Sequence, residues 1–192
     1  MPKDRAAAFS DGVIAILITI MVLELKAPIG TDASALRPLV PVFLTYVLSF
    51  VYLGIYWNNH HHLLQSAGRV NGRILWANLH LLFWLSLVPF ATAWMGGNHF
   101  AKGPTSLYGV VMLFAGVAYF LLQTAIIGEN RELAEVFGKD LKGKGSMAIY
   151  AVAIAVSFLN RWIGVALYVA VALIWLVPDR RLERRVEAAP PR

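Results

Sequence analysis

The chain has 192 residues, of which 58% are hydrophobic and only 15% are charged. Soluble domains carry about 25% charged residues, so the composition is typical of a membrane protein. The absence of cysteine excludes disulfides, thiolate metal sites and cysteine catalysis. The formal net charge of +6 fits either nucleic-acid binding or basic loops facing the cytoplasm, so its distribution along the chain has to decide.

Apolar stretches long enough to cross a membrane recur along the whole chain. A spanning helix needs about 20 mostly apolar residues. Loops are short except for the polar one over 128–144, and no spacer indicates a second domain. We therefore predict an all-α fold: a single bundle of six transmembrane helices over 1–192, with a basic tail at 179–192. The predicted spans are 5–25, 36–59, 71–94, 105–127, 145–159 and 162–177.

The first span is unusual because it carries Asp11 and Glu24. Ionisable side chains inside a bilayer are costly and usually face protein or water. We therefore expect this helix to be central, with the other helices around it. We also expect it to be a retained helix and not a cleaved signal peptide, because no small-residue cleavage site follows a short apolar core.

Basic residues indicate the orientation. If the N-terminus is cytoplasmic, 13 of the 17 Lys and Arg residues fall on the cytoplasmic side. The other four fall outside: Lys26, Arg37, Lys102 and Arg161. This bias is the one that membrane proteins show. It predicts a multi-pass protein of the cell membrane with both termini cytoplasmic, and it explains the net charge without nucleic acid. The third span is expected to bend at Pro89.

Helical spacing of about 100° per residue divides the first span into faces. Asp11 points roughly away from one apolar stripe, and Ser10 points to its side. Facing a symmetry axis, the stripe would form a narrow pore with aliphatic rings around a ring of Thr19 hydroxyls. The alternative is packing or lipid contact, with Thr19 bonded to its own helix. The stripe consists of Arg5, Phe9, Gly12, Ile16, Thr19, Ile20 and Leu23.

The run Arg5-x-x-x-Phe9-Ser10-Asp11-Gly12-Val13-x-Ala15-Ile16 resembles the signature of the endolysosomal potassium channel (transmembrane protein 175) family, including its bacterial and archaeal members. The signature lies within the first span. The segment Trp57-Asn58-Asn59-His60-His61-His62 is similar to the histidine-bearing segment of that family.

This resemblance implies a homotetramer with one six-helix unit per subunit and a central pore lined by the first helix of each. It implies conduction of potassium in preference to sodium without the usual filter, and no Thr-Val-Gly-Tyr-Gly run occurs here. The aliphatic constrictions would be Ile16 and Leu23, and the selectivity-tuning hydroxyl would be Thr19. Ile20 would be a further lining residue. The motif residues Arg5, Phe9, Ser10, Asp11 and Gly12 would serve helix packing and assembly.

Three successive histidines invite a metal interpretation, but neighbouring residues on a helix point about 100° apart and cannot all bind one ion. We expect instead a polar network between the first three helices, in which His61 or His62 pairs with Asp11 or Ser10. An ordinary interfacial histidine is the alternative for each. The other expected members of the network are Asn58, Asn78 and His80.

Two further features concern the ends of the bundle. Glu24 could concentrate cations at the outer pore mouth, or it could pair locally with Lys26 or with a residue of the outer loop. The basic run 180–185 is expected to anchor the last helix at anionic headgroups.

The resemblance implies a channel that passes monovalent cations passively, with potassium ions as the permeant species and no cofactor. Its partners would be its own copies and the lipid bilayer, not nucleic acid. We find no nucleophile–base arrangement and no phosphate-binding glycine loop, so we expect neither an enzyme nor a pump. Two alternatives remain: a proton-coupled or proton-conducting secondary transporter, and a metal-dependent membrane enzyme built on the histidines.

Overall fold

The computed structural model describes residues 2–128 and 140–176, and these residues form helices and connecting turns without strands. The predicted all-α class is therefore confirmed. Along the chain the helices are α1 (Lys3–Ile20), the short 3₁₀ helices η1 (Met21–Glu24) and η2 (Ala33–Leu39), α2 (Val40–Ser66), α3 (Gly72–Ser86), α4 (Val88–Gly97), α5 (Lys102–Ile127), α7 (Leu141–Leu159) and α8 (Arg161–Leu176).

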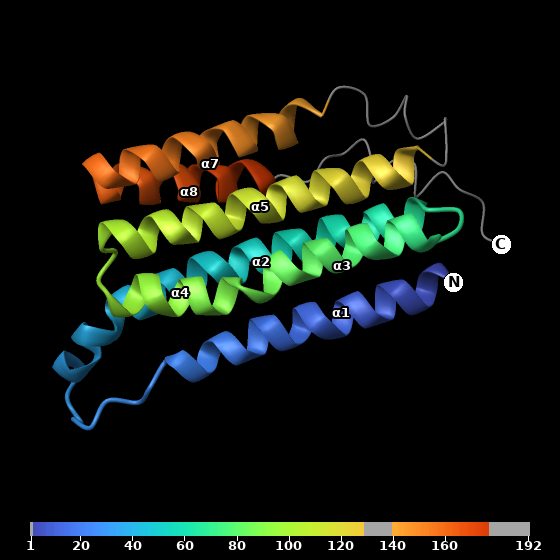
Figure 1. The fold of residues 1–192 in the computed structure, drawn as a ribbon. Coiled ribbons are helices and arrows are strands. Elements are labelled where there is room, and N and C mark those ends of the chain that lie inside the picture. The colour runs from blue at the N-terminus through green and yellow to red at the C-terminus, as the bar shows by residue number, and fades with distance from the viewer. Residues whose placement is uncertain (1, 129–139, 177–192) are drawn as a thin grey trace.

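The helices run up and down in an elongated bundle (Figure 1). α1 begins at the end where α2 finishes and α3 starts, and the α4–α5 and α7–α8 connections lie at the opposite end. Within the described residues, five helical segments are long and apolar enough to cross a membrane, and α8 is a shorter apolar helix. The chain is thus a multi-pass membrane protein.

Several helix bounds differ from the predicted spans: α5 begins at Lys102 and not at 105, and α7 begins at Leu141 and not at 145. α2 continues to Ser66, past the expected end near 59, because buried Leu63 and Leu64 continue its packed face beyond the polar histidines. The first span changes from α to 3₁₀ geometry at Met21. The bend expected at Pro89 is confirmed as a break at Leu87, after which α4 starts with the proline in its first turn, where no N–H is needed. The expected tail at 179–192, the basic run 180–185 and most of the loop 128–144 lie outside the described residues.

The centre of the subunit is α5, not α1. α5 packs against α3, α4, α7 and α8, whereas α1 packs against α2, α3 and α4 and lies at the edge of the bundle (Figure 1). Within one subunit, the expectation that the first helix is surrounded by the others is wrong. Its polar residues suggested a central place, but α5 has the small residues that allow close approach of neighbours on several sides.

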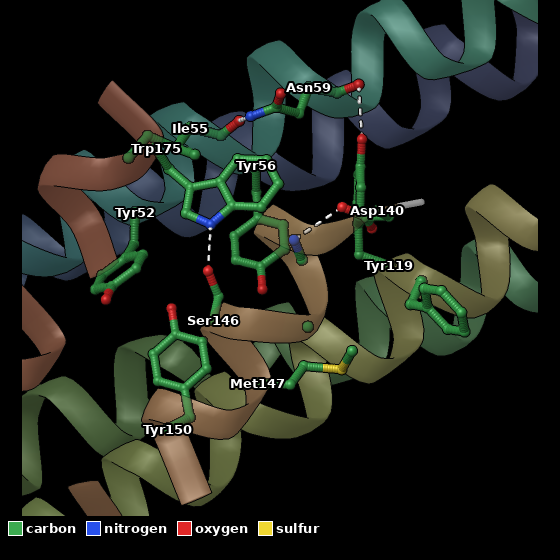
Figure 2. Close-up of a pocket in the computed structure, with 13 residues that line it drawn as sticks. Tyr52, Ile55, Tyr56, Asn59, Tyr119, Asp140, Ser146, Met147, Tyr150 and Trp175 are labelled. Atoms are coloured by element: carbon green, nitrogen blue, oxygen red, sulfur yellow. Dashed lines mark hydrogen bonds between the residues drawn. The ribbon is translucent and has the colours of Figure 1, made fainter. Parts of the chain in front are cut away.

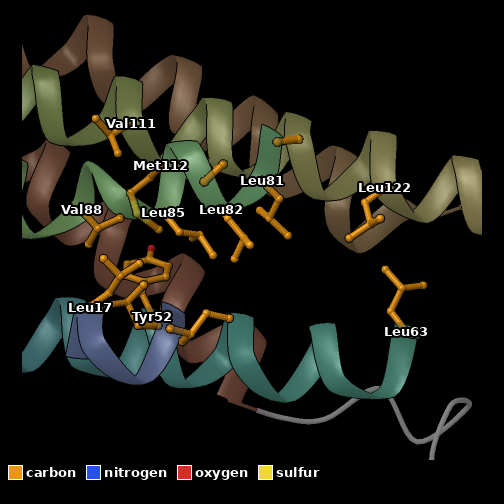
Figure 3. Packing of buried hydrophobic residues seen from close by; sticks show 14 of the residues in the cluster. Leu17, Tyr52, Leu63, Leu81, Leu82, Leu85, Val88, Val111, Met112 and Leu122 are labelled. Atoms are coloured by element: carbon orange, nitrogen blue, oxygen red, sulfur yellow. The ribbon is translucent and has the colours of Figure 1, made fainter. Parts of the chain in front are cut away.

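The bundle also encloses a small cavity between α2, α5, α7 and α8, lined mainly by aromatic side chains (Figure 2). Close packing of aliphatic side chains fills the space on the α1 side. Figure 3 shows Leu17 of α1 on the side of the cluster where Val88 and Leu85 lie. The buried face of α1 is part of this cluster.

Candidate functional site

α1 has a covered face and an uncovered face. Ala6, Ser10, Ile14 and Leu17 recur at helical spacing and are buried against the rest of the subunit. Ile16 lies on the other side and is 63% exposed, which is far from the 0% of Ile14 two residues earlier. Side chains at that spacing point in roughly opposite directions, so the contrast follows from helix geometry.

The stripe identified from the sequence is exposed as a complete set. We call it the α1 stripe, and no helix of the described subunit covers it. Leu23, at its C-terminal end, is 71% exposed. A continuous uncovered apolar strip of this kind marks a surface for lipid or for another protein. Its members are Arg5, Phe9, Gly12, Ile16, Thr19, Ile20 and Leu23.

Thr19 is the uncharged polar member of the stripe and lies in the last turn of α1. Its hydroxyl oxygen lies 3.0 Å from the backbone oxygens of both Ala15 and Ile16 and donates its proton to them. The bond back to its own helix is the arrangement expected of a lone threonine. A hydroxyl that has donated its only proton still offers lone pairs. Thr19 therefore presents an acceptor oxygen on an otherwise apolar surface.

The C-terminal end of the stripe follows 3₁₀ geometry, which turns about 120° per residue instead of 100°. Leu23 remains on the uncovered side, and Glu24 beside it is also exposed. Among the described residues, Glu24 forms no ion pair with Lys26. The local pairing considered for Glu24 is thus not formed, and its carboxylate is open to solvent at that end.

A hydrogen-bonded chain ties α1 to α2 and α3. The side-chain amide of Asn78 donates to Ser10 Oγ over 2.9 Å, and Ser10 donates to the Ala6 carbonyl over 2.9 Å. Asn78 Oδ1 must then accept, so His60 Nε2 carries the proton and donates to it over 2.6 Å. His60, Asn78 and Ser10 are all buried. The direction of every bond is fixed, which sets the height and rotation of α1.

Asp11 lies at the border between the two faces of α1 and is half-buried. It accepts a hydrogen bond from the indole of Trp57 over 3.0 Å. The predicted pairing of Asp11 or Ser10 with His61 or His62 is therefore wrong: Asp11 bonds to Trp57, and Ser10 bonds to Asn78. His61 lies one turn beyond Trp57 on the same face of α2, with the two ring centroids 6.1 Å apart, but the indole and not the imidazole bonds to Asp11.

The remaining predicted network residues do not join these bonds. His61 Nδ1 is buried without a hydrogen-bond partner among the described residues, and Asn58 makes no side-chain hydrogen bond there either. His80 is exposed and accepts from Trp84 Nε1 on its own helix over 3.0 Å. In the part of the chain that the structure describes, no three His, Asp or Glu side chains come together as a metal site.

The hydrogen-bonding roles of two residues, His60 and Trp57, were not predicted from the sequence. A signal for His60 was present, because it continues the buried positions of α2 at Thr45, Ser49, Tyr52 and Leu53 with helical spacing. The partner of Asp11 had no such signal. Which of two adjacent helices presents an indole at the height of a carboxylate depends on their relative rotation.

Comparison with known proteins places the chain in a family. The family model described as endosomal/lysosomal potassium channel TMEM175 matches residues 5–89. A protein from Chryseobacterium sp. (strain P1-3), named as a potassium channel, is 52% identical over 190 residues, which cover 97% of this chain and 99% of that protein. The rat endosomal/lysosomal proton channel TMEM175 is 27% identical over 150 residues, which cover 69% of this chain but 30% of the rat protein.

A solved structure agrees with this relationship. The crystal structure of a lysosomal potassium-selective channel TMEM175 homolog from Chamaesiphon minutus superposes with a TM-score of 0.82 and 28% sequence identity. The match covers 91% of this chain and 96% of that one. The chain is accordingly a member of the TMEM175 family.

Proposed function

We propose that this protein is a potassium channel whose pore is formed by the α1 stripes of four copies around a common axis. The observation that supports this most directly is the uncovered stripe itself, in which apolar side chains flank one hydroxyl oxygen. The names of the Chryseobacterium relative and of the Chamaesiphon structure support potassium as the permeant ion. The channel would work without a cofactor and without catalysis.

The proposed pore has two kinds of ring. Four Ile16 side chains and four Leu23 side chains would narrow the pore. A narrow apolar ring excludes water, and ions do not pass a constriction that is dry. Four Thr19 oxygens between them would replace part of the hydration shell of a passing cation. Ile20 would line the wall. Selection would favour the ion that gives up its water more easily, which is potassium rather than sodium.

The ends of the pore are assigned from charge. Glu24 is exposed beside Leu23, and four carboxylates at the outer mouth would attract cations. Arg5 and Phe9 lie at the other end of the stripe. There, together with Gly12, they would contact neighbouring copies and stabilise the tetramer. The bias of basic residues supports cytoplasmic termini, and α8 returns toward the end at which α1 begins (Figure 1).

The chain offers a clean test of this axis because it contains no cysteine. Ile16→Cys would place four equivalent thiols around the pore, and oxidation should give disulfide-linked subunits. Val152→Cys is the matched control, because Val152 is 54% exposed on α7, away from α1. Purified Ile16→Cys should also lose its unitary potassium current in bilayers when a thiol reagent is added, and the control should keep it. A current without cross-linking at Ile16 would place the pore elsewhere.

A second candidate, proton conduction, is favoured by the name of the rat relative. Reversal potentials separate the two. With symmetrical potassium and a pH difference, a potassium channel reverses near zero, whereas a proton pathway reverses toward the proton equilibrium potential. Saturable flux without unitary currents would favour a transporter instead.

A further inference from the structure

The aromatic cavity lies apart from the α1 stripe. Its volume is about 40 Å³, and its lining comes from α2, α5, α7 with its N-cap, and α8, with no residue from α1. One water needs about 10–15 Å³ of such volume, so the cavity has room for a group of a few heavy atoms. It lies in the half of the bundle where α7 begins and α8 ends.

The lining is dominated by aromatic rings. Aromatic faces carry a partial negative charge and attract cations, most effectively organic ammonium groups. Figure 2 shows side chains from α2, α7 and α8 around one space, with the hydroxyls of Tyr56 and Tyr150 directed toward it. The aromatic members of the lining are Tyr52, Tyr56, Tyr119, Phe120, Tyr150 and Trp175.

One formal charge lines the cavity, and it is negative. Asp140 is the N-cap of α7, and its Oδ1 accepts from the backbone N–H of Gly143 over 2.8 Å. Its Oδ2 makes no hydrogen bond among the described residues. A carboxylate beside a set of aromatic rings is the combination that binds organic cations, because attraction to the charge adds to attraction to the rings.

The chain's own lysines show that these rings accept ammonium groups. Lys142 Nζ lies 4.6 Å from the centre of the Trp175 ring, and Lys144 Nζ lies 5.8 Å from the centre of the Phe120 ring. Neither lysine lines the cavity. Their positive charges repel a multivalent cation more strongly than a singly charged one, so the site favours a singly charged group.

We propose that this cavity binds a small organic ammonium group, such as the trimethylammonium group of choline, between the aromatic rings and Asp140. A bare potassium ion would be a poor occupant, because one carboxylate and a few hydroxyls cannot replace its hydration shell as a ring of oxygens does. The site is independent of the proposed pore, and its test uses binding alone, so its failure would leave the channel proposal untouched.

The test compares choline with its uncharged isostere, 3,3-dimethylbutan-1-ol, by NMR titration of the purified protein in lipid-free detergent. Choline should bind saturably, and the isostere should bind about tenfold more weakly or worse. Asp140→Asn should weaken choline binding about tenfold. Asparagine is an equally good N-cap and keeps the bond to Gly143, so α7 should remain intact in this variant.

Gly116 provides a second variant that does not depend on charge. A Cβ at Gly116 would lie 3.5 Å from Met147 Cγ and 3.9 Å from the Tyr56 hydroxyl, both ordinary contacts. Gly116→Ala should therefore fold normally, narrow the cavity and weaken binding. Gly54→Ala is the matched control, since a Cβ there meets nothing within 4 Å and Gly54 does not line the cavity.

Three results would overturn the proposal: no saturable choline binding, equal affinity for the isostere, or unchanged affinity in both Asp140→Asn and Gly116→Ala. Glu24→Gln identifies binding at the pore mouth, and the proposal requires that it change nothing. Nanodiscs assign the source of the group. Lower apparent choline affinity with phosphatidylcholine than with phosphatidylglycerol alone indicates a lipid headgroup, and equal affinity in the two indicates a soluble amine.

Discussion

α1 and α5 are equally apolar by mean hydropathy, yet their surroundings are opposite. On α5, Tyr108, Met112, Ala115 and Leu122 are fully buried by neighbouring helices of the same chain. On α1, the stripe around Ile16 faces away from every described helix. Hydropathy reports preference for lipid over water, but it does not distinguish a lipid-facing surface from one covered by protein.

This contrast indicates where a second copy of the chain would pack in the proposed assembly. α5 satisfies its packing within the subunit, and side chains of α7 and α8 fill the space beside Gly109. α1 leaves Gly12, Thr19 and the aliphatic members of its stripe uncovered, and the Thr19 oxygen keeps unused lone pairs on that surface. An axis of identical copies would supply partners for this surface and would make the peripheral helix of the subunit the central helix of the assembly.

The largest expected effect separates two glycines. A Cβ at Gly109 of α5 would collide with the Tyr168 hydroxyl and lie 2.8 Å from Ile154 Cγ1, whereas a Cβ at Gly12 of α1 meets nothing within 4 Å in the subunit. Gly109→Val should lower the free energy of unfolding by about 2–4 kcal/mol, through overpacking and loss of the bond from Tyr168 to the Thr105 carbonyl.

Gly12→Ala should leave the unfolding midpoint of the subunit in detergent unchanged and act on the oligomer, measured by light scattering after size exclusion. Equal loss of subunit stability in both variants would show that α1 is packed as closely as α5, and it would remove the contrast between them.

The next effect concerns the chain of hydrogen bonds that joins α1 to the body of the subunit. Asn78→Ala would leave the buried His60 N–H without its acceptor and Ser10 without its donor, at a cost of about 1–3 kcal/mol. Asn58→Ala is the control, since Asn58 is half-buried and makes no hydrogen bond among the described residues, and it should cost about 0.5 kcal/mol or less. Chemical unfolding in mixed micelles measures both, and similar losses would mean that the chain of bonds does not anchor α1.

A smaller effect is expected at the border of the two faces, where Trp57 bonds to Asp11. Asp11→Ala and Trp57→Phe should each destabilise by about 1 kcal/mol, and a double-mutant cycle should show that most of this loss is shared. Asp11→Asn keeps an acceptor oxygen and should lose less than Asp11→Ala. Additive losses in the cycle would contradict a direct bond. Because Asp11 lies off the stripe, Asp11→Asn should alter assembly more than the unitary current.

Much of the fold follows from the sequence, because the length and hydropathy of a segment and the charge of its flanking loops are properties of that segment alone. The membrane class, the helical passes and the break before Pro89 depend on single segments and were predictable. The membership of the α1 stripe also follows from one helix alone, and the structure exposes these residues together. That the stripe lines a pore stays a prediction.

The rest depends on how helices sit against one another. His60 instead of His61, Trp57 as the partner of Asp11, and α5 as the centre of the subunit are set by the rotation and height of neighbouring helices. The spacing of residues along one helix does not contain that information. Hydropathy also placed the end of α2 too early, since polar residues lower it even where helix packing continues to Ser66.

The smallest expected effect is at Thr19, and it tests what the uncovered face does. Thr19→Val keeps the shape and removes the acceptor oxygen, whereas Thr19→Ser keeps the oxygen. Neither change should affect subunit stability by more than a few tenths of a kcal/mol, because the hydroxyl bonds only to its own helix. Thr19→Val should change the potassium-to-sodium permeability ratio about two- to fivefold, equivalent to about 0.4–1 kcal/mol, and Thr19→Ser should change it less.

Thr124→Val is the matched control. Thr124 is also exposed, and its hydroxyl donates to the Phe120 carbonyl of its own helix over 2.8 Å, but it lies on α5. Reversal potentials under bi-ionic conditions measure the ratio, and the same ratio in Thr19→Val as in the unmodified protein would mean that the permeating ion does not meet this hydroxyl.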